Sequence, residues 1–157
     1  MEMTIAQAIT MLTKLDTAIE NALAIEVADE AVRQMQHAIR NNVYEAYAPR
    51  FYSRRMEHGG LLDPHNIITH VENGNTLVVD NVTGLQNLWY SDTWAGDTSL
   101  LTPIIEEGNE AYLQPFPRPF MDYTVELLVG SGLAEQALKR GLARQGINTE
   151  IGVTFTA

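Results

Sequence analysis

The first third of the chain contains neither glycine nor proline, and this feature constrains the fold most. From Met1 to Ala48 nothing interrupts a helix. Apolar residues in this stretch recur at steps of three and four, which is the spacing of one helical face. The series is Ile5, Ile9, Leu12, Ile19, Leu23, Val27, Ala31, Met35, Ala38, Ile39 and Val43. We therefore predict a long amphipathic helix that Thr4 caps.

Two forms of this helix are open. A single helix from Thr4 to Tyr47 would be about 65 Å long, at about 1.5 Å per residue. Alternatively, the helix breaks near Leu15-Asp16-Thr17 and Asp16 caps a second helix. Either form suits side-by-side packing of helices in an oligomer.

The middle of the chain changes to a period of two. Residues 67–71 and 76–80 alternate in polarity, and Asn73-Gly74 lies between them. This pattern predicts a β-hairpin with Asn73-Gly74 in its turn. Residues 87–90 are a candidate for a further short strand. Residues 100–107, followed by Gly108, form either one helical turn or an edge segment.

Prolines organise the last third. Pro115, Pro117 and Pro119 fix φ near −65° and keep the residues before them out of the helical region, which predicts a stiff extended strut. We expect Pro119 at the first position of a helix that runs from Phe120 to about Val129. The segment 130–132 (Gly-Ser-Gly) then breaks it. A second helix covers 133–145, Gly146 ends it, and 147–155 alternates like a final strand.

This order of elements predicts an α+β fold with two layers, in which helices cover one face of a small, mostly antiparallel sheet. The length of 157 residues fits a single domain, residues 1–157. An apolar fraction of 45% and a charged fraction of 19% are typical of globular chains. There is no cysteine, no long apolar run and no signal-peptide pattern at the N-terminus, so we expect a soluble protein without disulfides.

The charge balance argues against nucleic-acid binding as the main task. Twenty acidic residues face ten basic ones, giving a formal net charge of −10. A non-specific nucleic-acid binder replaces counterions with Lys and Arg, and this chain has few of them.

No catalytic constellation is visible in the sequence. The four histidines do not have the spacing of a metal-binding motif. The segment 130–132 lacks the preceding strand and the following lysine of a phosphate-binding loop. Asp63, His65 and His70 are the one weak Asp/His set. We therefore predict no catalytic residue, no cofactor and no metal site.

Several residues are candidates for contact with partner proteins. Tyr52 lies beside Arg54 and Arg55, whose positive charge is expected to pair with acidic residues of the same chain or of a neighbouring subunit. Trp94, in a polar loop, either folds back onto the core or anchors a partner. The strut presents Arg118 between two prolines, followed by Phe120, and Arg118 is either a partner contact or a solvated side chain.

The order of these motifs resembles the small neck proteins of long-tailed bacteriophages, the head–tail joining and tail-completion family. In that family an N-terminal helix rich in Ala and Ile precedes a loop, a short hairpin, a segment ending in Glu and Gly, and an Arg-Pro-Phe before the last helix. The matching pieces here are Pro49 with Tyr52, Arg54-Arg55, Gly59-Gly60-Leu61-x-Asp63-x-x-Asn66-Ile67, Ile104-Ile105-Glu106-Glu107-Gly108, Pro117-Arg118-Pro119-Phe120 and Ala137-Leu138-x-x-Gly141-Leu142-x-x-Gln145-Gly146-Ile147. Tyr52-Ser53-Arg54-Arg55 departs from the pattern, since Thr-Gly is commoner there.

The resemblance implies a non-enzymatic virion subunit, made in the host cytoplasm, that forms a ring of six copies between the head connector and the tail or completes the tail. Its partners would be copies of itself and the neighbouring connector and tail proteins, with DNA passing through the channel without specific binding. Acidic side chains would face that channel, with Glu106, Glu107 and Glu110 as candidates, because a negative lumen does not trap phosphate. Arg54, Arg55 and Arg118 would lie at subunit contacts.

Two rival hypotheses belong to other classes. The first is a small soluble hydrolase-like enzyme with a site at Asp63, His65 and His70. The second is a host-derived regulatory or toxin-like module.

Overall fold

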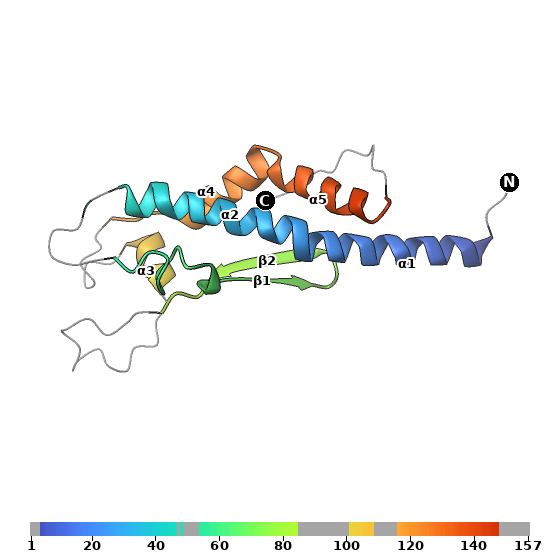
Figure 1. Cartoon of the computed structure of the whole chain (residues 1–157), viewed down its shortest axis with the longest axis horizontal. Coiled ribbons are helices and arrows are strands. Elements are labelled where there is room, and N and C mark those ends of the chain that lie inside the picture. The colour runs from blue at the N-terminus through green and yellow to red at the C-terminus, as the bar shows by residue number, and fades with distance from the viewer. Residues whose placement is uncertain (1–3, 47, 49–53, 85–100, 109–115, 148–157) are drawn as a thin grey trace. The chain divides into compact units, whose positions relative to one another are not determined.

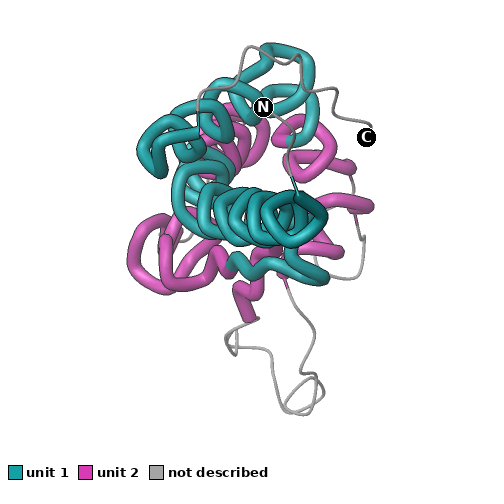
Figure 2. The backbone as a smooth tube through the Cα atoms, turned by 90° about the vertical axis from the view of Figure 1, so that its right-hand side faces the viewer, with its two compact units in different colours: residues 1–33, 69–79, 125–157 teal, residues 34–68, 80–124 magenta. Residues whose placement is uncertain are grey.

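The computed structural model describes residues 4–46, 48, 54–84, 101–108 and 116–147 (Figure 1). Its contacts divide the chain into two compact units (Figure 2). Unit 1 comprises Met1–Arg33, Thr69–Val79 and Val125–Ala157, and unit 2 comprises Gln34–Ile68 and Asp80–Thr124. The fold is α+β, as predicted, with a long N-terminal helix, a two-stranded sheet and C-terminal helices.

The N-terminal helix is continuous from Ile5 to Tyr44, so the structure has the single-helix form and not the alternative with a break near residues 15–17. The helix comprises α1 (Ile5–Ala22), the π-helical turn η1 (Leu23–Val27), α2 (Ala28–Ile39) and a second π-helical turn, η2 (Arg40–Tyr44). Asp16 lies inside α1 rather than at a cap. Thr4 caps the helix as predicted: its hydroxyl accepts from the Gln7 N–H, and the Gln7 side chain accepts from the Thr4 N–H at 2.8 Å.

The hairpin forms as predicted. Strand β1 (Ile67–Glu72) pairs with β2 (Thr76–Asn81), and a short 3₁₀ turn, η3 (Pro64–Asn66), precedes β1. Asn73 and Gly74 have φ values of 53° and 74°. A tight hairpin turn needs positive φ at both central residues, which asparagine and glycine tolerate.

The core of unit 1 forms where α5 (Leu133–Arg144) packs against α1 and η1. Small side chains bring the two helices close together, and larger ones fill the space around them. The cluster contains Ala18, Ala22, Leu23, Val27, Ala134, Ala137, Leu138 and Leu142. The hairpin residues Val71 and Leu77, together with Ile147, pack against this cluster.

Ion pairs reinforce the same helix contact. Glu26 and Glu30 are almost fully buried, and each carboxylate meets an arginine of α5: Glu26 lies 2.6 Å from Arg144, and Glu30 lies 3.4 Å from Arg140. Arg33 also pairs with Glu30 at 2.6 Å. A buried carboxylate needs such a partner, because its desolvation would otherwise be costly.

Unit 2 contains buried residues from the helical stretch, the loop 54–66, β1, α3 (Leu101–Glu107) and α4 (Phe120–Val125). Its buried apolar residues are Met35, Ala38, Ile39, Val43, Leu61, Leu62, Ile67, Ile104, Ile105 and Phe120. Two fully buried polar residues are satisfied within it. Asn81 donates to the Leu61 carbonyl at 2.9 Å and accepts from the Thr83 hydroxyl at 2.6 Å. These bonds hold the loop against the end of β2.

The C-terminal helices follow the glycines as predicted. The helix α4 (Phe120–Val125) continues through the π-helical turn η5 (Glu126–Gly130). Gly132 (φ 71°) precedes α5, and Gly146 (φ 79°) follows it. Pro119 lies one position earlier than expected, since its carbonyl accepts the first helical bond from Tyr123. In the segment predicted as a helical turn or an edge segment, Leu101–Glu107 form a helix, and residue 100 lies outside the described residues.

Two predicted strands, residues 87–90 and most of 147–155, lie outside the described residues. Among the described helices, none combines the length and apolar character needed to span a bilayer.

Candidate interaction surface

The predicted partner arginines of the loop are engaged within the chain. The guanidinium of Arg54 lies over the Tyr44 ring, 5.2 Å from its centroid, and donates to the Tyr44 carbonyl. Arg55 donates to the Gly84 carbonyl at 2.9 Å. Burial raises the pKa of the Tyr44 hydroxyl. Both arginines are partly exposed and hold the loop in place, so any partner would meet only part of each side chain.

The strut residues take different positions. Phe120 is completely buried in the core of unit 2 and presents no surface to a partner. Pro119 is exposed and Arg118 is partly exposed, while the backbone N–H of Arg118 donates to the Ile105 carbonyl at 2.8 Å. The exposed aromatic residue here is Phe116, with 71% of its surface accessible. Tyr52 and Trp94 lie outside the described residues.

Glu106, a predicted channel residue, has a role inside the fold. Its carboxylate accepts from the backbone N–H of Met121 at 2.6 Å and so caps α4. Burial raises the pKa of Glu106, and nearby Asp122 adds to this effect. Glu107 is exposed, and Glu110 lies outside the described residues.

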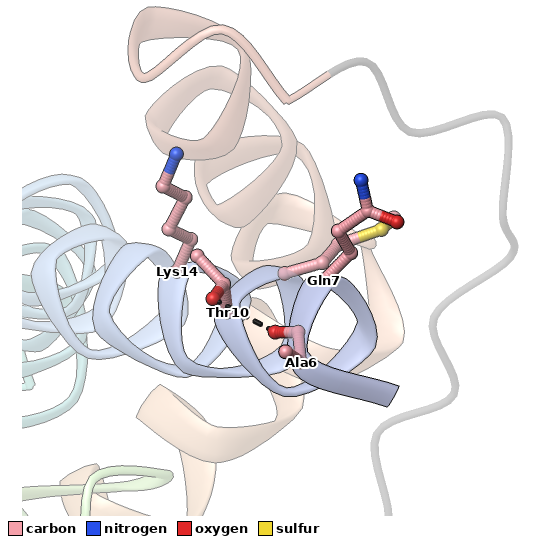
Figure 3. A pocket seen from close by; sticks show the side chains of 5 residues that line it. Ala6, Gln7, Thr10 and Lys14 are labelled. Atoms are coloured by element: carbon pink, nitrogen blue, oxygen red, sulfur yellow. Dashed lines mark hydrogen bonds between the residues drawn. The ribbon is translucent and has the colours of Figure 1, made fainter. Parts of the chain in front are cut away.

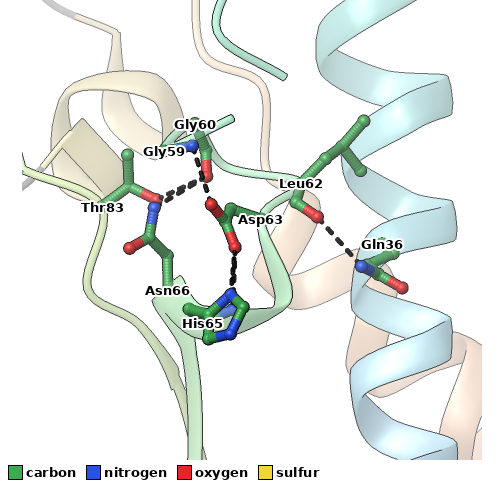
Figure 4. A network of polar contacts seen from close by, with 8 residues as sticks. All are labelled: Gln36, Gly59, Gly60, Leu62, Asp63, His65, Asn66 and Thr83. Carbon is green, nitrogen blue, oxygen red and sulfur yellow. Dashed lines mark hydrogen bonds and ion pairs between the residues drawn. The ribbon is translucent and has the colours of Figure 1, made fainter. Parts of the chain in front are cut away.

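Asp63, the centre of the rival enzyme hypothesis, also acts as a cap (Figure 4). Its carboxylate accepts from the backbone N–H groups of Gly59 at 2.7 Å and His65 at 3.0 Å. These bonds lower the pKa of Asp63 to about 2, with the His65 ring adding a further contact at 2.9 Å. Both acceptor oxygens are therefore used in ordering the loop.

The histidines do not complete a metal site in the described part of the chain. The His65 side chain is 93% exposed, and His70 pairs instead with Glu72 on its own strand at 3.0 Å. No group of three or more His, Asp or Glu side chains among the described residues is arranged to hold a metal ion.

Among the described residues, several large apolar side chains are exposed near the start of α1. Figure 1 shows the N-terminal part of α1 extending past the hairpin and α5. There Ile5, Ile9, Met11 and Leu12 have 81%, 59%, 65% and 60% of their surface exposed. Ile5, Ile9 and Leu12 follow one another at steps of four and three and form one stripe, which we call the α1 stripe. The helical periodicity placed Ile5, Ile9 and Leu12 on one helical face, but sequence spacing does not tell which end of a long helix the rest of the chain covers.

A groove lies along the same helix and borders the α1 stripe at Ile9. Residues of α1 and of the segment at the end of α5 line a hollow of about 660 Å³. A second hollow of about 390 Å³, lined by α1 residues closer to the N-terminus, shares Thr10 and Lys14 with it (Figure 3). The lining residues are Ala6, Gln7, Ile9, Thr10, Met11, Thr13, Lys14, Thr17, Ala18, Gln145, Gly146 and Ile147. We call the two hollows together the α1–α5 groove.

Comparison with known proteins identifies the family. The YomN family model matches residues 6–144, which is most of the chain. The chain therefore belongs to the YomN family, a phage-derived family, and is a phage-associated protein. No curated protein and no solved structure matches it.

Proposed function

We propose that this chain is a structural subunit of the phage virion. Copies of it form a ring, six in number, that joins the head connector to the tail or completes the tail and surrounds the DNA channel. The ring is not an enzyme, and its partners are copies of itself and the neighbouring connector and tail proteins. The subunit is made in the host cytoplasm and resides in the neck or tail of the virion.

The observation that carries the proposal is the α1 stripe. From Ile5 to Thr13 the helix has no charged side chain, although the chain as a whole has a net charge of −10. Ile and Thr are only moderate helix formers, and a short isolated helical segment is marginal in water. An exposed, uncharged helical extension of this kind is well suited to burial against a neighbouring subunit. Membership of a phage-derived family supports a virion role.

The net charge supports a position around DNA. A ring of six such subunits would carry a large negative charge, which repels the phosphate backbone instead of binding it. Glu107, which is exposed, is the best candidate for the channel wall among the described acidic residues of α3. Glu106 is a weaker candidate because it caps α4.

The test is the assembly state of the full chain and of a charged stripe variant. Ile5→Glu/Leu12→Glu places two charges in the α1 stripe, and Gln7→Glu adds charge to the opposite face of the same helix as a matched control. We expect light scattering after size-exclusion chromatography to show rings for wild type and Gln7→Glu, alone or with neck and tail extract. The stripe variant should remain a folded monomer.

Two results would contradict the proposal. One is a wild-type chain that stays monomeric and enters no particle when neck and tail proteins are present. The other is an Ile5→Glu/Leu12→Glu chain that assembles as well as wild type. A folded circular dichroism spectrum for each variant separates loss of assembly from loss of structure.

A further inference from the structure

The threonines of α1 give the α1–α5 groove an apolar floor. The hydroxyls of Thr10, Thr13 and Thr17 each donate to the carbonyl four residues earlier, at 2.9, 3.0 and 3.0 Å. Hydroxyls that are satisfied in this way do not need water, so each threonine can offer its methyl group to a neighbour. Ile9, Ala18 and Met11 extend this surface.

The groove also contains one charge without a described partner. Among the described residues, Lys14 is the only charged one that lines either hollow. No described residue forms an ion pair or hydrogen bond with its ammonium group. A segment that fills the groove should therefore be mostly uncharged and carry one acidic group near Lys14.

The chain itself supplies such a segment at the mouth of the groove. The described chain ends at Ile147, which lines the groove together with Gly146. Residues 148–157 follow, and Glu150 is their only charged side chain. Apolar residues alternate in them at Ile151, Val153 and Phe155. An alternating segment presents one apolar face and one polar face, which suits a groove that is open to water on one side.

The lengths agree. From Ala18 to Ala6 the helix advances about 18 Å, at about 1.5 Å per residue. Residues 148–157 would span about 33 Å if extended, at about 3.3 Å per residue. Glu150 lies three residues after Ile147, about 10 Å along an extended chain, which reaches the turn of α1 that carries Lys14.

We propose that residues 148–157 bind in the α1–α5 groove of their own chain and run toward the N-terminus of α1, with Glu150 paired to Lys14. The tether favours this arrangement over capture of a second copy, because a short linker gives an effective concentration of about millimolar. Ile5 and Leu12 of the α1 stripe line neither hollow and stay free for a neighbouring subunit, whereas Ile9 lies at the edge of the groove. The proposal does not depend on the function proposed above.

Because the chain has no native cysteine, engineered cysteine pairs can be crosslinked without competition from other thiols. Thr10→Cys is combined in turn with Ile151→Cys, Val153→Cys and Phe155→Cys in the full chain. The control combines Leu12→Cys, which lies on the α1 stripe, with the same tail positions. Under mild oxidation we expect an intrachain disulfide in at least one Thr10 pair, independent of protein concentration, and none in the Leu12 pairs.

A charge swap provides the second measurement. Lys14→Glu should raise amide hydrogen exchange in residues 148–157 several-fold, and Lys14→Glu/Glu150→Lys should restore it. Interchain disulfides that depend on concentration would show that the groove takes the tail of another copy, which overturns the proposal. Equal crosslinking in the Leu12 pairs, or tail exchange that ignores Lys14→Glu, would overturn it as well.

Discussion

At the scale of single residues, Gly141 limits how closely α5 approaches α1. An added Cβ at this position would lie 2.6 Å from the Ala22 Cβ and 2.9 Å from its Cα, and would also clash with the Glu26 carboxylate. Gly141→Ala should therefore destabilise the protein by about 1–3 kcal/mol despite the better helix propensity of alanine. The measurement is the free energy of unfolding in urea.

Gly130 is the matched control for this substitution. Among the described residues, a Cβ there would meet only the Glu126 side chain, at 3.9 Å. Gly130→Ala should stay within about 0.5 kcal/mol of wild type or be slightly stabilising. If both variants unfold at the same urea concentration, close packing at Gly141 is not what joins the two helices.

Asp63 predicts a specific dependence of stability on pH. Its pKa is lowered from 3.8 to about 2, so its ionised form stabilises the fold. That contribution is complete above pH 3.8 and is lost as the pH falls toward 2. The difference in urea midpoint between wild type and Asp63→Asn should be constant above this window and shrink within it. Parallel curves from pH 5 to pH 2 would contradict the capping role.

At the scale of elements, the Glu106 carboxylate of α3 links this helix to the first turn of α4. Glu106→Ala removes the acceptor for the Met121 N–H and should cost about 1 kcal/mol of unfolding free energy. Glu107→Ala, at the exposed neighbouring position, should change it by less than about 0.5 kcal/mol.

The same pair of variants separates a structural role from a channel role. If Glu106→Ala is as stable as Glu107→Ala but particle formation or DNA passage is impaired, Glu106 acts at the channel and not as a cap. If Glu106→Ala is less stable than Glu107→Ala, any role of Glu106 at the channel surface is secondary to its role as a cap.

Caps and turns that are specified by the residues within them were predictable from the sequence. Thr4, Asn73-Gly74, Gly132 and Gly146 each specify a cap or a turn through their own backbone preferences, and the structure confirms all four. The continuity of the long helix was not decided, because Asp16 is equally acceptable on an exposed helix surface and at a cap.

Roles that depend on distant contacts could not be predicted in this way. The burial of Phe120 and the capping of α4 by Glu106 are set by residues far apart in the sequence. The same holds for Arg55, whose carbonyl partner belongs to Gly84. A pattern of residue types shows that an arginine or an aromatic side chain is present but not which surface it faces.

At the scale of the whole molecule, the proposed function depends on assembly. The chain belongs to a phage-derived family, carries a net charge of −10 and exposes an uncharged apolar helix end. In the ring proposed here, the α1 stripe makes the subunit contacts while the acidic surplus keeps DNA from binding the wall. The buried residues of each unit stabilise the fold, and the exposed end of α1 makes the proposed contacts between subunits.

The most direct measurement is a cryo-EM reconstruction of the phage particle that carries this protein. The account predicts copies of the chain arranged around the DNA channel at the neck or the tail end, with the Ile5–Leu12 segment of α1 buried against an adjacent copy. A reconstruction in which no copy encircles the channel would contradict the account.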